Sequence, residues 1–123
     1  MSPSDTSGRD TGRDAIAAFA HHLRVASEGT AAELRSTMLI PELAAGLPFT
    51  LYAVGMKGLA ALSLVEGRVL SSDARVGPLG ACVSCLLDVR VSTAKGERTG
   101  IVAVWCLPDG KAFVASMNSQ WFN

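Results

Sequence analysis

The chain has no excess of charge of either sign, and it has no long apolar run. Eleven basic side chains balance eleven acidic ones, so the composition provides no electrostatic attraction to nucleic acid or an anionic membrane. Lys57, Glu66 and Arg68 interrupt the longest apolar stretches before they reach the roughly 20 residues that a membrane-spanning helix needs. We therefore expect a soluble protein whose partners are neither nucleic acid nor membrane.

Histidine and cysteine, which are common metal ligands, are also scarce. The two histidines, His21 and His22, are adjacent, so on a helix they diverge by roughly 100° and lack the spacing of a zinc site. Cys82 and Cys85 form a C-x-x-C pair, but residues three apart on a strand point to opposite faces. We interpret them, and Cys106, as buried thiols, and we expect neither a metal nor a cofactor.

The first twelve residues are rich in Ser, Asp, Thr, Gly and Arg and lack the apolar core of a secretion signal. We expect segment 1–12 to be a disordered tail and the protein to be cytoplasmic. Residues 13–123 are long enough for one domain, and the chain is 49% apolar, which is sufficient for a hydrophobic core.

Two helices are predicted near the N-terminus. Apolar residues recur every three or four positions from Asp14 to Ser27, and Gly29 ends this pattern. A second, short helix is expected from Ala31 to Met38, with Thr30 as its N-cap. Residues 40–48 contain two prolines and a glycine and are expected to form a loop.

The next segment, Phe49 to Val65, is ambiguous because its glycines weaken every assignment. Leu51 to Val54 is compatible with a short strand, and Gly58 to Val65 with a third helix. Four strands then follow, separated by turns at 77–80, 95–98 and 108–111, and they cover Arg68 to Val76, Ala81 to Val91, Gly100 to Leu107 and Ala112 to Phe122.

This order of elements predicts an α+β fold. We expect a curved antiparallel sheet of four to five strands with the N-terminal helices packed on one face, enclosing a conical cavity for a small molecule. The strands at 81–92 and 101–107 have apolar residues on both sides, while the helices suffice to cover one face only. The sequence therefore predicts a homodimer formed through the sheet.

The C-terminal part of the chain also carries a resemblance to a known family. Residues Arg90 to Asn123 include the stretch V-W-x-L-P-D-G-K over Val104 to Lys111, and together with Asp14 to Gly29 they resemble the NTF2-like superfamily, or cystatin-like α+β cone. That superfamily includes ketosteroid isomerase, limonene epoxide hydrolase and polyketide cyclases of the SnoaL type. The resemblance implies chemistry without a cofactor on a hydrophobic small molecule, such as a polyketide or terpenoid intermediate.

The resemblance also indicates which positions would line the cavity. The oxyanion-binding tyrosine of ketosteroid isomerase corresponds to about His22, its general base to Tyr52, and its second acid to Val102. None of these residue types is kept, so that mechanism is not expected. Limonene epoxide hydrolases carry an R-x-D pair on a strand, and this chain has the reverse order, Asp88-Val89-Arg90.

Asp88 and Arg90 are the candidate catalytic pair because residues two apart on a strand share a face. If that face lines the cavity, Asp88 is the candidate base and Arg90 its ion partner or an oxyanion donor. The alternative is that the face meets solvent or a second subunit, where the two residues are a weak surface pair. His22 and Tyr52 are candidate hydrogen-bond donors in the cavity, although each is also compatible with a purely structural role.

The cavity wall, on the same analogy, comprises Phe19, Leu86, Val102, Val104, Met117, Ser119 and Trp121. Two functions follow from this site. One is an isomerase, cyclase or epoxide hydrolase that uses acid/base chemistry on an apolar ligand. The other is a non-catalytic module of the same fold that binds a small molecule or assembles as a dimer.

Overall fold

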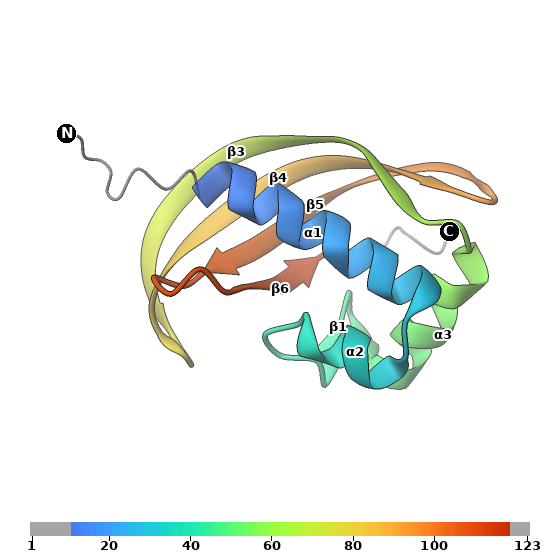
Figure 1. The fold of residues 1–123 in the computed structure, drawn as a ribbon, viewed down its shortest axis with the longest axis horizontal. Helices are drawn as coiled ribbons and strands as arrows, with labels where there is room; N and C mark the ends of the chain where they lie inside the picture. The colour runs from blue at the N-terminus through green and yellow to red at the C-terminus, as the bar shows by residue number, and fades with distance from the viewer. Residues whose placement is uncertain (1–10, 119–123) are drawn as a thin grey trace.

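The computed structural model describes residues 11–118, which form an α+β fold with one layer of helices against one face of an antiparallel sheet (Figure 1). The elements, in chain order, are α1 (Thr11–Glu28), α2 (Ala31–Ser36), β1 (Leu43–Ala44), β2 (Leu47–Pro48), α3 (Phe49–Leu59), β3 (Ser63–Gly77), β4 (Gly80–Thr93), β5 (Gly96–Cys106) and β6 (Ala112–Met117). The expected fold class and the N-terminal helix packed on an antiparallel sheet are confirmed.

The main sheet has the strand order β3-β4-β5-β6, and every neighbouring pair is antiparallel. Gly80, Gly96 and Gly110 have φ angles of 96°, 112° and 94° in or beside the three connecting turns. Positive φ is nearly free of steric cost for glycine alone. These glycines therefore let three tight turns join long strands, which explains why the hairpins are recognisable from the sequence.

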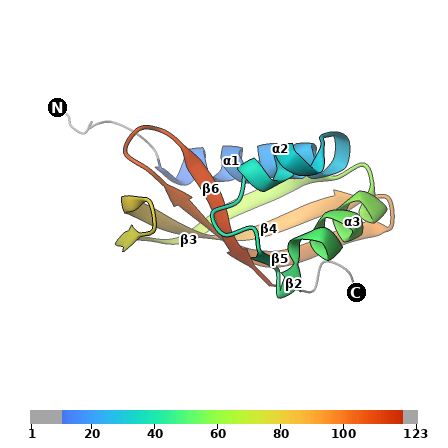
Figure 2. The same cartoon turned by 90° about the horizontal axis from the view of Figure 1, so that it is seen from below.

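Helix α1 lies along the concave side of the bent sheet, with α2 and α3 near its C-terminal end (Figures 1 and 2). Its buried positions follow the three-and-four spacing of one helix face: Ala15, Phe19, His22, Leu23 and Ala26. They pack on the buried side chains of the sheet, among them Leu87, Val89 and Val91 of β4. The hydrophobic core therefore lies between α1 and the concave face.

One edge of the sheet is covered by a short stretch of chain that follows α2. The Leu39 N–H donates to the Val114 carbonyl, and the Val114 N–H donates to the Thr37 carbonyl, each over 2.9 Å. These bonds satisfy the outward-facing backbone groups of Val114, at the middle of β6. The other edge is β3, which pairs with β4 alone within residues 11–118.

The structure corrects several predicted boundaries. Leu51 to Val54 is not a strand but the middle of α3, and residues 63–65 of the expected third helix begin β3. Helix α1 already includes Thr11 and Gly12, which had been assigned to the tail, and the 40–48 loop contains the small hairpin β1-β2.

Strand β6 ends at Met117, and the remaining predicted strand positions, with Ser119 and Trp121, lie outside the described residues. All three cysteines are buried and free, as the sequence predicts. No helix within residues 11–118 is long and apolar enough to cross a membrane.

Candidate functional site

The face of the sheet that points away from α1, called the open face below, carries the predicted pair Asp88 and Arg90. Cross-strand partners share a face, and Asp88 pairs with Arg68 and Ile101 while Arg90 pairs with Glu66 and Thr99. Along three strands the open face includes Glu66, Arg68, Ser71, Asp73, Ser84, Leu86, Asp88, Arg90, Ser92, Glu97, Thr99, Ile101, Ala103 and Trp105.

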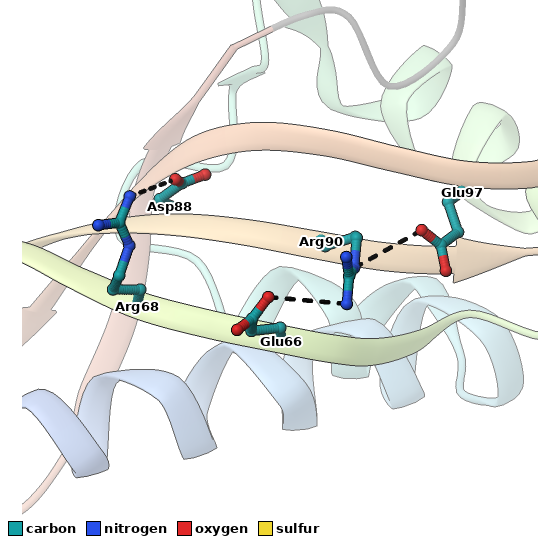
Figure 3. Close-up of polar contacts among 5 residues, drawn as sticks. All are labelled: Glu66, Arg68, Asp88, Arg90 and Glu97. Carbon is teal, nitrogen blue, oxygen red and sulfur yellow. Dashed lines mark hydrogen bonds and ion pairs between the residues drawn. The ribbon is translucent and has the colours of Figure 1, made fainter.

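Five charged side chains form a cluster on this face (Figure 3). The Arg68 guanidinium lies 3.0 Å from the Asp88 carboxylate. Arg90 lies between two acids, 3.6 Å from Glu66 and 3.6 Å from Glu97. Together with Val89 and Thr99, four of these side chains line a polar hollow of about 250 Å³.

The sequence did not identify Arg68, Glu66 or Glu97 as partners. Counting back from the Gly77–Gly80 turn would place Arg68 opposite Val89, but a register shift between Val69 and Ser71 moves it opposite Asp88. A β-bulge of this kind adds one residue to one strand and cannot be read from turn positions alone.

Apolar side chains lie beside the charged cluster on the same face. Leu86 and Ile101 keep 36% and 38% of their surface exposed, and Ala103, opposite Leu86, is half-buried. We call these three residues the apolar strip. Next to it, Trp105 packs so closely on the β3-β4 turn that a Cβ on Gly77 would lie 2.0 Å from its ring.

The other two candidate donors lie on the opposite side of the sheet, in the core. His22 and Tyr52 are fully buried, and the His22 Nε2 atom lies 2.7 Å from the Tyr52 hydroxyl. The His22 Nδ1 atom lies 2.7 Å from Thr37 Oγ1, and the Tyr52 hydroxyl oxygen also lies 3.3 Å from the Met117 sulfur. The network thus links α1, α2, α3 and β6.

The donor and acceptor roles in this network follow from the bond between Thr37 and the backbone. The Thr37 hydroxyl donates to the Leu34 carbonyl over 2.7 Å, so at Thr37 the imidazole must be the donor, through Nδ1–H. Nε2 is then the acceptor that faces the Tyr52 hydroxyl. Burial lowers the pKa of His22 from 6.5 to about 3, with a smaller contribution from neighbouring His21, and burial raises the pKa of Tyr52 above its ordinary 10.0.

The sheet therefore divides the predicted site into two groups. Asp88, Arg90 and Leu86 lie on the open face. The other described members lie in the core, where Phe19, His22, Tyr52, Val102, Val104 and Met117 are all buried. Because a layer of backbone separates the two groups, they do not form one site.

An apolar pocket of about 270 Å³ lies where the three helices meet, and no sequence motif indicates it. It is lined by Val25, Ala26, Gly29, Thr30, Ala31, Leu34, Ala53, Val54 and Lys57. The Lys57 ammonium donates to the Gly29 carbonyl over 2.9 Å at its rim. Small residues at facing helix positions were the available signal, but identifying the pocket required knowing that α3 is a helix.

Comparison of the chain with models of known protein families, with curated proteins and with solved structures gave no match. The open face, the buried network and the pockets are therefore the features of the chain that bear on its function.

Proposed function

We propose that the protein is a non-catalytic assembly module, two copies of which pack through the open faces of their sheets. The observation that carries this proposal is the apolar strip, Leu86, Ile101 and Ala103, exposed beside a charged cluster at the centre of the sheet. Apolar surface next to a polar border is typical of protein interfaces. A second copy is the occupant that this surface suits best.

The charged cluster supports self-association because it contains both signs. Arg68 and Arg90 alternate with Glu66, Asp88 and Glu97 across three strands (Figure 3). In a two-fold dimer each surface meets a copy of itself. A cluster of one sign would repel its copy, whereas alternating signs allow an arginine of one copy to face a carboxylate of the other.

The acid/base alternative receives less support from this geometry. The Asp88 side chain is 41% exposed and bonded to Arg68 on the open face, whereas a base in a cone cavity would point toward α1. In the space between α1 and the sheet lie the fully buried side chains of Phe19, His22 and Tyr52. A substrate between the layers would have to displace them.

Sedimentation equilibrium tests the assembly proposal by comparing a substitution on the open face with a substitution on the helical side of the molecule. Ile101→Glu places a carboxylate in the apolar strip, and because the contact is two-fold, each dimer would bury it twice. We expect a dimer for the unaltered chain and a dimer dissociation constant at least about 100-fold weaker for Ile101→Glu.

Leu51→Glu is the matched control, because Leu51 is 58% exposed on α3, away from the open face. It should leave the dimer dissociation constant unchanged. The proposal fails if the chain is a monomer at every concentration tested, or if Ile101→Glu and Leu51→Glu have equal effects.

A second candidate function, binding of an apolar small molecule, is favoured by the pocket between the three helices. The pocket is lined almost entirely by aliphatic carbon, and its volume of about 270 Å³ suits a ligand with a few fused or linked rings at most. N-phenyl-1-naphthylamine, an uncharged dye that fluoresces in apolar surroundings, is a suitable probe. Filling the pocket by Ala53→Phe should abolish the fluorescence increase, while Ile101→Glu should not. Equal fluorescence in both variants would reject this candidate.

A further inference from the structure

Charges of opposite sign alternate in both directions on the β3 and β4 part of the open face (Figure 3). Along β3, Glu66 is followed two residues later by Arg68, and along β4, Asp88 is followed two residues later by Arg90. Across the two strands, Glu66 pairs with Arg90. Arg68 pairs with Asp88 in the same way. We call these four residues the charge square.

The two register shifts of β3 bound the stretch that contributes to this square. They lie between Leu64 and Glu66 and between Val69 and Ser71, and pairing is regular over residues 66–69. A slip of one residue within that stretch would turn its charges to the face that packs on α1. The bulges therefore hold both charges of β3 in register with those of β4.

The two arginines of the square differ in how they are held. Arg68 donates to Asp88 Oδ2 over 3.0 Å. Arg90, by contrast, is 3.6 Å from each of its two acids, which is beyond hydrogen-bond range. Within the described residues, neither the Arg90 side chain nor the Asp88 Oδ1 atom has a hydrogen bond. Arg90 thus keeps its donors, and Asp88 keeps one acceptor, for a partner.

Symmetry limits how the square can meet a copy of itself. Two sheets that pack face to face in a two-fold dimer are related by an axis that lies between them. An axis along β4 would bring Arg90 against Arg90 and Asp88 against Asp88, which repel. An axis along the strands between β3 and β4 would bring opposite charges together, but Ile101 on β5 would then lie beyond the edge of the other sheet.

An axis that crosses the strands between Asp88 and Arg90 avoids both faults. It places Arg90 of each copy opposite Asp88 of the other. The same rotation places Arg68 of each copy opposite Glu66 of the other. Every contact within the two squares is then between charges of opposite sign.

We propose that Arg90 of each copy donates to Asp88 Oδ1 of the other across this axis, so that the two β4 strands run antiparallel. The inference rests on the proposed assembly through the open face and adds the contact that orients the copies. The exposed Ile101 side chain is covered, because it faces Thr99 of the other copy. The polar hollow of about 250 Å³ between the charged side chains leaves room for the incoming guanidinium.

Charge reversal on separate chains tests this pairing by sedimentation equilibrium. Arg90→Glu alone would bring two acids together at both contacts, and Asp88→Arg alone would bring two arginines together. Each variant alone should have a dimer dissociation constant at least about 100-fold weaker than that of the unaltered chain. In an equimolar mixture, the introduced glutamate of one chain faces the introduced arginine of the other, and the native pair forms at the second contact. The mixture should therefore form a heterodimer within about tenfold of the original affinity. Ion pairs within one copy cannot give this recovery, because the substitutions are on different chains.

Glu97→Arg is the matched control, because Glu97 lies as close to Arg90 within one copy as Glu66 does but faces no charge across the axis. It should change the dissociation constant by less than about tenfold. Circular dichroism checks that each variant folds. If a reversal prevents folding, Arg90→Gln and Asp88→Asn replace it in a double-mutant cycle, in which the combined loss of affinity should be smaller than the product of the two single losses.

The outcomes separate this pairing from the assembly proposal. If the unaltered chain dimerises and Ile101→Glu weakens it, but the mixture of reversed chains stays monomeric, the pairing is wrong and the assembly proposal stands. A loss from Glu97→Arg equal to that from Asp88→Arg, or independent losses in the cycle, would also overturn the pairing. A chain that is monomeric at every concentration would overturn both.

Discussion

The hydroxyl of Tyr52 lies 2.7 Å from the Nε2 atom of His22, with both side chains fully removed from solvent. A bond between two buried polar groups is more costly to break than its net contribution to stability suggests, because either partner alone keeps its desolvation penalty. The pair joins α1 to α3, and through Thr37 it reaches the end of α2. It therefore fixes how the helices pack against each other.

Stability should fall in mild acid because of His22. Its pKa is about 3 in the folded protein against an ordinary 6.5, so between these values the unfolded chain binds a proton that the folded chain does not. Unfolding free energy should therefore decrease as the pH drops from about 6.5, by up to about 1.4 kcal/mol per pH unit. Urea denaturation between pH 5 and 6.5 measures the slope.

His22→Gln should flatten that slope, since the variant lacks the titrating group while keeping a donor and an acceptor. The window stays above the range in which carboxylates such as Glu33 protonate. Equal slopes in the two proteins would show that another group causes the acid sensitivity.

Tyr52 should not ionise while the protein is folded. It is the only tyrosine in the chain, so phenolate absorbance at about 295 nm reports it alone. Because burial raises its pKa, its contribution to stability is present below the ordinary pKa and is lost as the pH rises above it. We expect the absorbance to increase only together with unfolding, as followed by circular dichroism. A reversible titration near pH 10 in the folded state would contradict the burial.

Gly77→Ala should destabilise the β3-β4 turn, because the added Cβ would lie 2.0 Å from the Trp105 ring. We expect a loss of about 1–3 kcal/mol, typical of overpacking, and a change in the near-ultraviolet circular dichroism of Trp105. Gly58→Ala is the control, since nothing lies within 4 Å of its added Cβ and the residue is in α3. That variant should gain about 0.5–1 kcal/mol from helix propensity. Equal effects at the two positions would contradict the packing of Trp105.

The Arg68-Asp88 ion pair should contribute little to the stability of one copy. Both side chains are well exposed, at 70% and 41%, so solvent screens their attraction, and a double-mutant cycle with alanine should give a coupling of less than about 1 kcal/mol. Measuring the cycle in the Ile101→Glu background removes any contribution from association. A larger coupling energy would indicate that the charged cluster stabilises the fold of a single copy.

The sequence predicted those parts of the fold that depend on local signals. Glycines at the turns and the spacing of Phe19 and Leu23 identified the hairpins and α1. Prediction from the sequence failed in α3, where the local signals conflicted. The buried face of this helix comprises Phe49, Tyr52, Met56 and Leu59. Their spacing is helical, but the glycines in the same segment argued against a helix.

The candidate site was harder to predict because its geometry is tertiary. The alternation of residues along β4 correctly placed Asp88 and Arg90 on one face and Leu87 and Val89 on the other. Which of these two faces packs against α1 depends on how much apolar surface each face of the whole sheet would bury. The apolar group is buried, as the hydrophobic effect favours. Membership of the NTF2-like superfamily, catalysis and the dimer stay predictions.

The bulges in β3 affect whether another chain can add to this edge of the sheet. A free edge strand 15 residues long is normally a template to which another chain can add by backbone hydrogen bonding. Here the register shifts beside Val65 and Leu70 break the regular row of donors and acceptors into short stretches, and charged side chains flank them. Lateral growth into fibrils is thereby opposed, which agrees with the proposal that copies pack through the open face and not along the strand edge.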